Sequence, residues 1–113
     1  MDIWEKGQYK EIWVYLKENE DDERTMMALL NGDWGWLMYL REEGDSGFSS
    51  RNPDYAGTDD DDNMMEFMLS NGQLDHYPLS YIISANQVME ALDYFEKHHE
   101  LPGFITWHDN AFL

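Results

Sequence analysis

Residues 25–40 read TMMALLNGDWGWLMYL, two apolar runs joined by an Asn-Gly-Asp turn. Asn-Gly between apolar runs is a strong signal for a β-hairpin, because the turn that matches the twist of the strands needs positive φ at its central residues. Both runs are apolar along nearly their whole length, which is typical of central strands with at least one face covered by a helix. The sequence therefore predicts two antiparallel strands here.

A second turn of the same kind lies at residues 70–72, where Ser-Asn-Gly separates the segments 65–69 and 73–77. Between the two turns, residues 47–51 form a short candidate strand. Two Asn-Gly turns in one chain favour an antiparallel meander.

The clearest helix follows the second hairpin. The Ser84 hydroxyl can cap its first turn while Gln87 reaches back to the cap, and Ile83 can pack on Val88 as a hydrophobic staple. We expect this helix to run to about residue 99. Its buried stripe is expected to comprise Val88, Ala91, Leu92 and Phe95, with His99 as a candidate fifth member.

The segment after this helix reads Leu-Pro-Gly at residues 101–103, which ends the helix, and residues 104–107 form a last short strand. We expect Phe48 and Trp107 to share one core with Leu92 and Phe95.

The N-terminal segment fits two periodicities. Its apolar residues recur at i, i+3, i+4 and i+7, which predicts a helix over residues 8–18. Those residues are Tyr9, Ile12, Trp13 and Leu16. A strand is the alternative, because Ile12, Val14 and Leu16 also alternate and Trp, Val and Tyr favour sheets. The helix is the prediction adopted for the fold.

Together these elements predict an α+β fold, in which an antiparallel or mixed β-sheet meander carries an N-terminal helix and one long C-terminal helix and closes with a short strand. The chain has 113 residues, of which 42% are hydrophobic and 15% aromatic, enough for one domain with a core. No internal repeat or linker divides it, so we expect a single domain over residues 1–113.

The charge balance excludes several functions. With 7 Lys and Arg against 24 Asp and Glu, the formal net charge is −17. Affinity for nucleic acid or an anionic membrane depends on basic side chains, so we expect neither to bind directly. A basic protein partner suits this chain, and its aromatic content is far above that of a disordered acidic tail.

Cysteine is absent, which excludes disulfides and thiolate metal sites and is compatible with a reducing compartment. The first residues lack the basic start and apolar run of a signal peptide, and no apolar stretch approaches the roughly 18 residues that span a bilayer. We therefore expect a cytoplasmic protein.

No catalytic or metal-binding constellation stands out. The histidines, His76, His98, His99 and His108, lack the spacing of a helical zinc site, and no nucleophile elbow or phosphate loop occurs. Residues 59–63 resemble the start of a calcium loop, but its sixth and twelfth positions are Met64 and Ser70. We expect no enzyme activity, no cofactor and no metal.

The distribution of charge indicates an interaction surface. From Asn52 to Phe95 there is no Lys or Arg but nine acidic residues, interleaved with aromatic and Met side chains. Such a field accelerates association with a cationic partner, although acidity for solubility alone is the alternative. The candidate partner-binding residues are Asp45, Asp54, Tyr55, Asp59, Asp60, Asp61, Asp62 and Glu66.

Several short motifs carry a family resemblance between Thr25 and Trp107. They are LMYL at 37–40, GDSGFSS at 44–50, Gly57, the capped helix with Ala91 and Phe95, and PGFITW at 102–107. This pattern resembles immunity protein family 1 of bacterial polymorphic toxin and contact-dependent inhibition systems.

The resemblance implies a small α+β cytosolic protein, encoded beside a toxin, that binds the toxin's C-terminal domain and blocks it. Family members often accompany toxins of the nucleic-acid deaminase fold, and others accompany nucleases. We therefore expect an immunity protein, monomeric when free, that occludes the active site of a toxin domain with a basic surface. The alternative is an acidic nucleic-acid mimic or adaptor that binds a basic host or phage protein.

Overall fold

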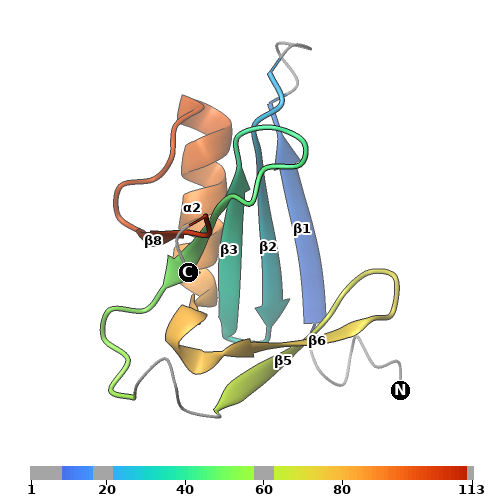
Figure 1. The fold of residues 1–113 in the computed structure, drawn as a ribbon, viewed down its shortest axis with the longest axis vertical. Coiled ribbons are helices and arrows are strands. Elements are labelled where there is room, and N and C mark those ends of the chain that lie inside the picture. Colours follow the sequence, from blue (N-terminus) through green and yellow to red (C-terminus); the bar gives the residue numbers. More distant parts are fainter. Residues whose placement is uncertain (1–8, 17–21, 58–62, 112–113) are drawn as a thin grey trace.

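The computed structural model describes residues 9–16, 22–57 and 63–111. They form a main antiparallel sheet, a helix on one of its faces and a two-stranded ribbon on the other (Figure 1). The strand order of the main sheet is β1-β2-β3-β4-β8, and the short β7 pairs with the start of β3.

The main sheet is built from β1 (Tyr9–Tyr15), β2 (Thr25–Asn31), β3 (Trp34–Leu40), β4 (Phe48–Arg51), β7 (Ile83–Ser84) and β8 (Thr106–Asp109). The ribbon is built from β5 (Met64–Met68) and β6 (Leu74–Pro78), followed by a 3₁₀ turn, Leu79–Tyr81. The helix is α2 (Ala85–His98). The predicted α+β class and the long C-terminal helix are confirmed, and strands β1 to β4 form the expected meander.

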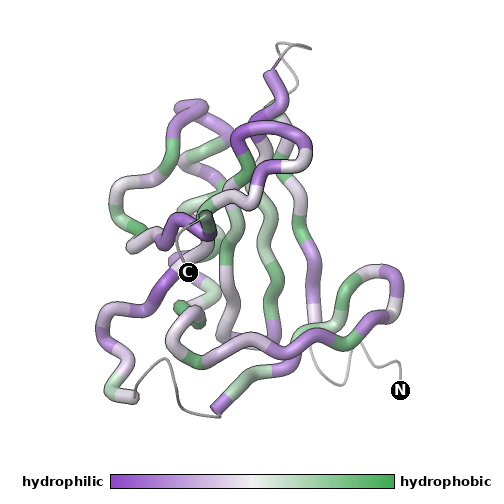
Figure 2. The backbone as a smooth tube through the Cα atoms, in the orientation of Figure 1, coloured by the Kyte–Doolittle hydropathy of each residue, from purple (hydrophilic) through white to green (hydrophobic). Residues whose placement is uncertain are grey.

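The first predicted hairpin is confirmed. Strands β2 and β3 pair along their full length, and the central strands are hydrophobic over most of that length (Figure 2). Asn31 pairs with Trp34, so the central residues of the turn are Gly32 and Asp33 rather than Asn31 and Gly32. Only Gly32 has positive φ, 61°, which is the pattern of a type II′ turn.

The second predicted hairpin is also confirmed, but it does not extend the main sheet. The Leu69 N–H donates to the Gln73 carbonyl at 2.8 Å, and Gly72 has a φ of 90° in the intervening three-residue loop. The expectation of one continuous meander was wrong here. The apolar side of the ribbon, which includes Phe67 and Tyr77, packs flat on the main sheet instead of pairing with its edge.

The predicted N-terminal helix is wrong, and the alternative strand is correct. Residues Tyr9–Tyr15 form β1, an edge strand paired along its full length with β2. Ile12 and Leu16 are spaced by four residues, which satisfies both periods, so they could not decide between them. Pairing with β2, a tertiary interaction, satisfies the backbone of β1 and selects the strand.

Helix α2 begins as predicted. The Ser84 hydroxyl accepts a hydrogen bond from the Gln87 N–H at 3.2 Å, and the Gln87 side chain accepts one from the Ser84 N–H at 3.3 Å. The helix ends at His98. His99 is its left-handed cap with φ 55°, so His99 does not continue the buried stripe.

The core between α2 and the sheet contains the predicted stripe. Its buried members are Leu16, Met26, Ala28, Leu30, Leu37, Tyr39, Ile83, Val88, Ala91, Leu92, Phe95 and Ile105. Phe48 and Trp107 pack against the same cluster, as predicted. The last strand, however, begins two residues later than expected, because Phe104 is exposed and Ile105 supplies the buried side chain.

Candidate partner-binding surfaces

Asp45 lies in the turn between β3 and β4, where its carboxylate is held by Arg41. The Arg41 side chain donates two hydrogen bonds of 2.9 Å to it, and the Arg41 backbone N–H donates a third. These bonds hold the pKa of Asp45 well below its usual range, the side-chain bonds contributing most. The carboxylate of Asp45 therefore shapes the turn.

Asp54 and Tyr55 follow β4 in a bend organised by Asn52. The Asn52 N–H donates to the Ser80 carbonyl at 2.7 Å, and the Asn52 side chain accepts from the Asp54 N–H at 2.9 Å. Two cavities adjoin this bend, and both are lined by Asn52. Asp54 lines one of these cavities and Tyr55 lines the other.

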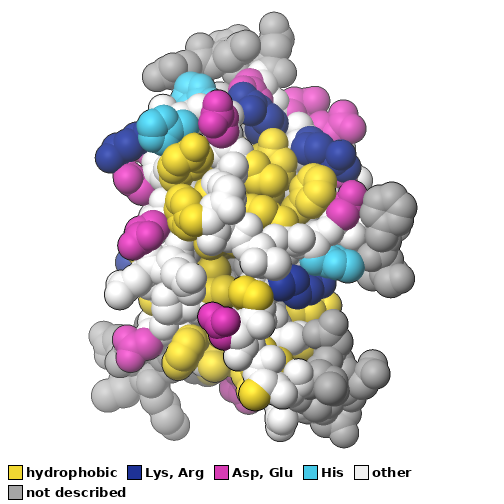
Figure 3. Space-filling model, turned by 90° about the vertical axis from the view of Figure 1, so that its left-hand side faces the viewer, with side chains coloured by type: hydrophobic (Ala, Val, Ile, Leu, Met, Phe, Trp, Pro, Cys, Tyr) yellow, Lys and Arg dark blue, Asp and Glu magenta, His cyan; other side chains and the backbone are white. Residues whose placement is uncertain are grey.

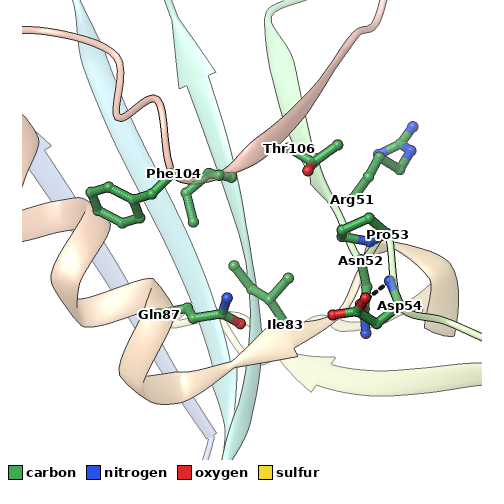
Figure 4. Close-up of a pocket in the computed structure, with 9 residues that line it drawn as sticks. Arg51, Asn52, Pro53, Asp54, Ile83, Gln87, Phe104 and Thr106 are labelled. Atoms are coloured by element: carbon green, nitrogen blue, oxygen red, sulfur yellow. Dashed lines mark hydrogen bonds between the residues drawn. The ribbon is translucent and has the colours of Figure 1, made fainter.

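The first cavity is polar and has a volume of about 80 Å³. Figure 4 shows Gln87 and Phe104 on one side of it and Asp54 and Arg51 on the other. The Arg51 guanidinium also lies over the Tyr81 ring, 3.6 Å from the ring centroid. This cation is therefore already in contact with an aromatic ring of its own chain.

The second cavity is apolar and has a volume of about 240 Å³. Its lining residues are Trp34, Asn52, Tyr55, Met65, Leu79 and Ile82. Because Trp34 is 48% exposed, an aromatic ring stands at the mouth of this cavity, where the main sheet meets the ribbon. Such a hollow can receive an apolar side chain of a partner.

Glu66 lies on β5 and links the ribbon to the main sheet. Its carboxylate accepts a hydrogen bond from the Tyr9 hydroxyl at 3.2 Å and lies 3.6 Å from His76 Nε2, while its carbonyl accepts from the Asn31 side chain. Desolvation, and then the Glu66 carboxylate, raise the pKa of Tyr9. Side chains alternate along a strand, so Met65 rather than Glu66 faces the apolar cavity.

The predicted residues are only partly brought together. Asp54, Tyr55 and Glu66 lie toward the end of β3 where it turns to β2, whereas Asp45 lies beyond the opposite end. The run Asp59, Asp60, Asp61 and Asp62 lies outside the described residues. On the side of the molecule in Figure 3, acidic, basic and histidine side chains are interleaved, so this side is not uniformly anionic.

A further exposed surface was missed by the sequence prediction. The rings of Trp13 and Tyr15 stack near the C-terminal end of β1, with their centroids 6.1 Å apart and their planes at 8°. These side chains are 42% and 52% exposed. Because a helix was predicted for this segment, the alternation that would place both rings on one face of a strand was not used. The signal was present, because aromatic residues at 13 and 15 alternate with aliphatic residues at 12 and 14.

Among the residues that the structure describes, no group of three or more His, Asp or Glu side chains is arranged to hold a metal ion. Within the same residues, no helix is long and apolar enough to cross a membrane.

Comparison with known proteins agrees with the resemblance seen in the motifs. The chain matches the family described as Immunity protein Imm1 over residues 5–109, nearly its whole length. No curated protein matches the chain. The extent of the family match is decisive, and the chain belongs to the Imm1 family of immunity proteins.

Proposed function

We propose that this immunity protein neutralises a toxin domain that acts on nucleic acid, of the deaminase fold or a nuclease, by covering its active-site cleft. Inhibition would be non-enzymatic, by one protein domain that is cytoplasmic and monomeric until it meets the toxin. Family membership supports a toxin as the partner. The observation that carries the class of toxin is the net charge of −17.

Charge supports this class because a toxin that binds nucleic acid needs a basic groove to contact phosphates. An acidic surface can occupy such a groove by imitating the charge of the backbone, and it also accelerates the encounter of the two proteins. Aromatic side chains beside the acidic ones would supply the short-range contacts.

The proposed contact surface lies where the ribbon meets the main sheet. Asp54, Tyr55 and Glu66 would contact the toxin there, with Trp34 at the mouth of the apolar cavity. The run from Asp59 to Asp62 is proposed to add negative charge to this surface. Asp45 would act through its turn, since its carboxylate is bonded to Arg41.

The experiment is to co-express the chain with the toxin domain encoded beside it and to purify the two together. We expect the cells to survive and a complex to form, and inhibition of the purified toxin to depend on the molar ratio of the two proteins. If no toxin domain binds, and a basic protein of the host or of a phage is captured in its place, the proposed function is wrong.

Association kinetics then test the mechanism. Replacing Asp59, Asp60, Asp61 and Asp62 together by Asn should slow association at low salt, and the effect should shrink as salt rises because exposed charges act over about 8 Å at physiological ionic strength. Tyr55→Ala should mainly accelerate dissociation, with little dependence on salt. The charge-matched control replaces Glu90, Glu96 and Glu100 by Gln and Asp93 by Asn, which removes four exposed charges in and just after α2. An unchanged association rate in the quadruple variant would exclude a steering role for the acidic run.

A further inference from the structure

We propose that the outer half of the main sheet, on the face opposite α2, is a second docking surface that receives an arginine side chain of the toxin. This inference rests on the proposed function. We call the surface the open half-face and define it by Trp13, Tyr15, Thr25 and Leu40, with Glu23, Glu42 and Glu43 at its rim.

The open half-face exists because the ribbon covers only part of the sheet. Phe67 and Tyr77 of the ribbon pack on Trp36, with ring centroids of Trp36 and Tyr77 4.4 Å apart. In the strand register, Trp13 and Tyr15 lie farther than this contact from the turn that joins β2 to β3. Their rings therefore stay exposed although the strand beneath them is paired.

The geometry of the open half-face suits one side chain. Its hollow has a volume of about 310 Å³, at the lower end of the range for ligand pockets of roughly 300 to 1,000 Å³. The stacked rings of Trp13 and Tyr15 stand along one side. A flat guanidinium can lie against such aromatic faces and gain a cation–π interaction.

The rim of the open half-face is acidic. Glu23, Glu42 and Glu43 are all exposed, and no Lys or Arg is among the described residues that line the hollow. Among the described residues, two neighbouring cations are bonded elsewhere: Arg24 to Asp22 and the His99 carbonyl, and Arg41 to Asp45. A guanidinium placed in the hollow would thus find carboxylates able to accept charge-assisted hydrogen bonds.

The backbone that carries the acidic rim is held by hydrogen bonds and an ion pair. The Asp45 N–H donates to the Glu42 carbonyl at 3.2 Å, and the ion pair of Arg41 with Asp45 closes the same turn at 2.9 Å. On β2, between Tyr15 and Leu40 in the strand register, the Thr25 hydroxyl donates to the Glu23 carbonyl at 3.3 Å. A preorganised rim loses less conformational entropy when a partner binds.

Charge complementarity selects a basic partner. A second copy of this chain would carry the same charge of −17 and would bring further carboxylates to the rim, which is repulsive. The chain itself contains the proposed type of contact, because Arg51 lies over Tyr81 and Arg41 over Phe48. An arginine on the basic surface of a nucleic-acid-directed toxin is the occupant that fits both the rings and the rim.

The test measures the affinity of an inactivated toxin domain, encoded beside the chain, for the parent and for variants. We expect the rim variant Glu23→Gln, Glu42→Gln and Glu43→Gln to bind at least about tenfold more weakly, as for truncated anchors of an interface, and Trp13→Ala to lose at least as much. The control Glu90→Gln, Asp93→Asn and Glu96→Gln removes three carboxylates from α2 and should change affinity by less than about threefold. Melting temperatures would establish that each variant is folded.

The outcomes separate the two proposals. If the toxin binds the parent and the rim variant equally, the open half-face is not a docking surface, while the proposed function stands. If the toxin does not bind the parent at all, the proposed function fails and the inference fails with it. Hydrogen exchange of the complex gives an independent readout, since residues 9–16 and 40–43 should become protected, and lack of protection there would overturn the inference.

Discussion

The two faces of the main sheet are covered to different extents by the same chain. On one face, α2 buries Ala28 of β2 completely, and Val88 and Phe95 of the helix are equally buried. On the other face, the ribbon buries Leu29 and Trp36 but leaves Trp13 and Tyr15 exposed on β1. Both faces are apolar, so hydrophobicity alone does not distinguish the part that stabilises the fold from the part that is free to bind.

The difference indicates which part of the chain holds the fold together and which part stays exposed. Burial of apolar area is the dominant favourable contribution to folding, and the helix-covered face holds the larger of the two buried clusters. The other face of the sheet can then stay partly exposed without loss of the fold. Substitutions on the two faces should therefore separate stability from binding, and the following changes test that division.

The largest effect is expected at Phe95 on the helix-covered face. Phe95 is fully buried and its ring meets Tyr39 edge-on at 5.8 Å, so Phe95→Ala should lower the free energy of unfolding by about 3 to 5 kcal/mol. Urea denaturation measures this loss. The control Met89→Ala, on the exposed side of the same helix, should change stability by about 0.5 kcal/mol or less. Equal stability of the two variants would mean that α2 does not carry the core.

An intermediate effect is expected at Gly35 of β3, which lies in close contact with β2 and next to Val88 of α2. A Cβ added there would lie 2.7 Å from the Leu29 carbonyl oxygen and 3.1 Å from Val88 Cγ2, too close without a shift of the helix or strand. Gly35→Ala should therefore cost about 1 to 3 kcal/mol, the usual range for overpacking. The matched control is Gly103→Ala, where a Cβ would meet nothing within 4 Å. If both variants unfold alike, the helix-covered face is looser than described.

The smallest effect is expected at Asp45, in the turn beside the open half-face. Arg41 holds the pKa of this carboxyl below its ordinary value of 3.8, so the contribution to stability is full above that pH and is lost as pH falls through the lower, folded-state pKa. The melting temperature of Asp45→Asn should thus lie below that of the parent by a constant amount between about pH 5 and 7. The gap should close in stronger acid.

Arg41→Gln provides the complementary variant, because it removes the other partner of the same ion pair. Its difference from the parent should follow the same pH dependence. A gap that persists unchanged in strong acid would show that the ion pair is not its cause. Toxin binding should weaken in both variants if the turn positions Glu42 and Glu43 for the open half-face.

Elements with a local signal could be predicted from the sequence. The two glycine turns and the capping box at Ser84 depend on side chains within a few residues, and all three are confirmed. The local signal of strand β1 is ambiguous, because Ile12 and Leu16 satisfy both helical and strand spacing and only the alternation over residues 12–15 favours the strand. The docking of the ribbon was also beyond prediction, since a turn determines which strands pair but not where the pair packs.

For the candidate site as well, local features could be predicted from the sequence and tertiary contacts could not. Asp54 and Tyr55 were chosen from charge and composition, and the structure places them beside cavities. Charge counts cannot reveal that Asp45 is bonded to Arg41, because that contact depends on the backbone of the turn. Nor could they find Trp13 and Tyr15, whose exposure depends on how far the ribbon reaches across the sheet.

The edge position of β1 has a consequence for solubility. Among the described strands, β1 pairs with β2 alone, and an edge strand can in general pair with a strand of another molecule. The high negative charge opposes such contacts between identical chains, at distances up to the Debye length. Added salt would therefore weaken the proposed attraction to a basic toxin and, at the same time, screen the repulsion between identical chains. The same negative charge would thus serve both the proposed attraction to a toxin and the mutual repulsion of free copies.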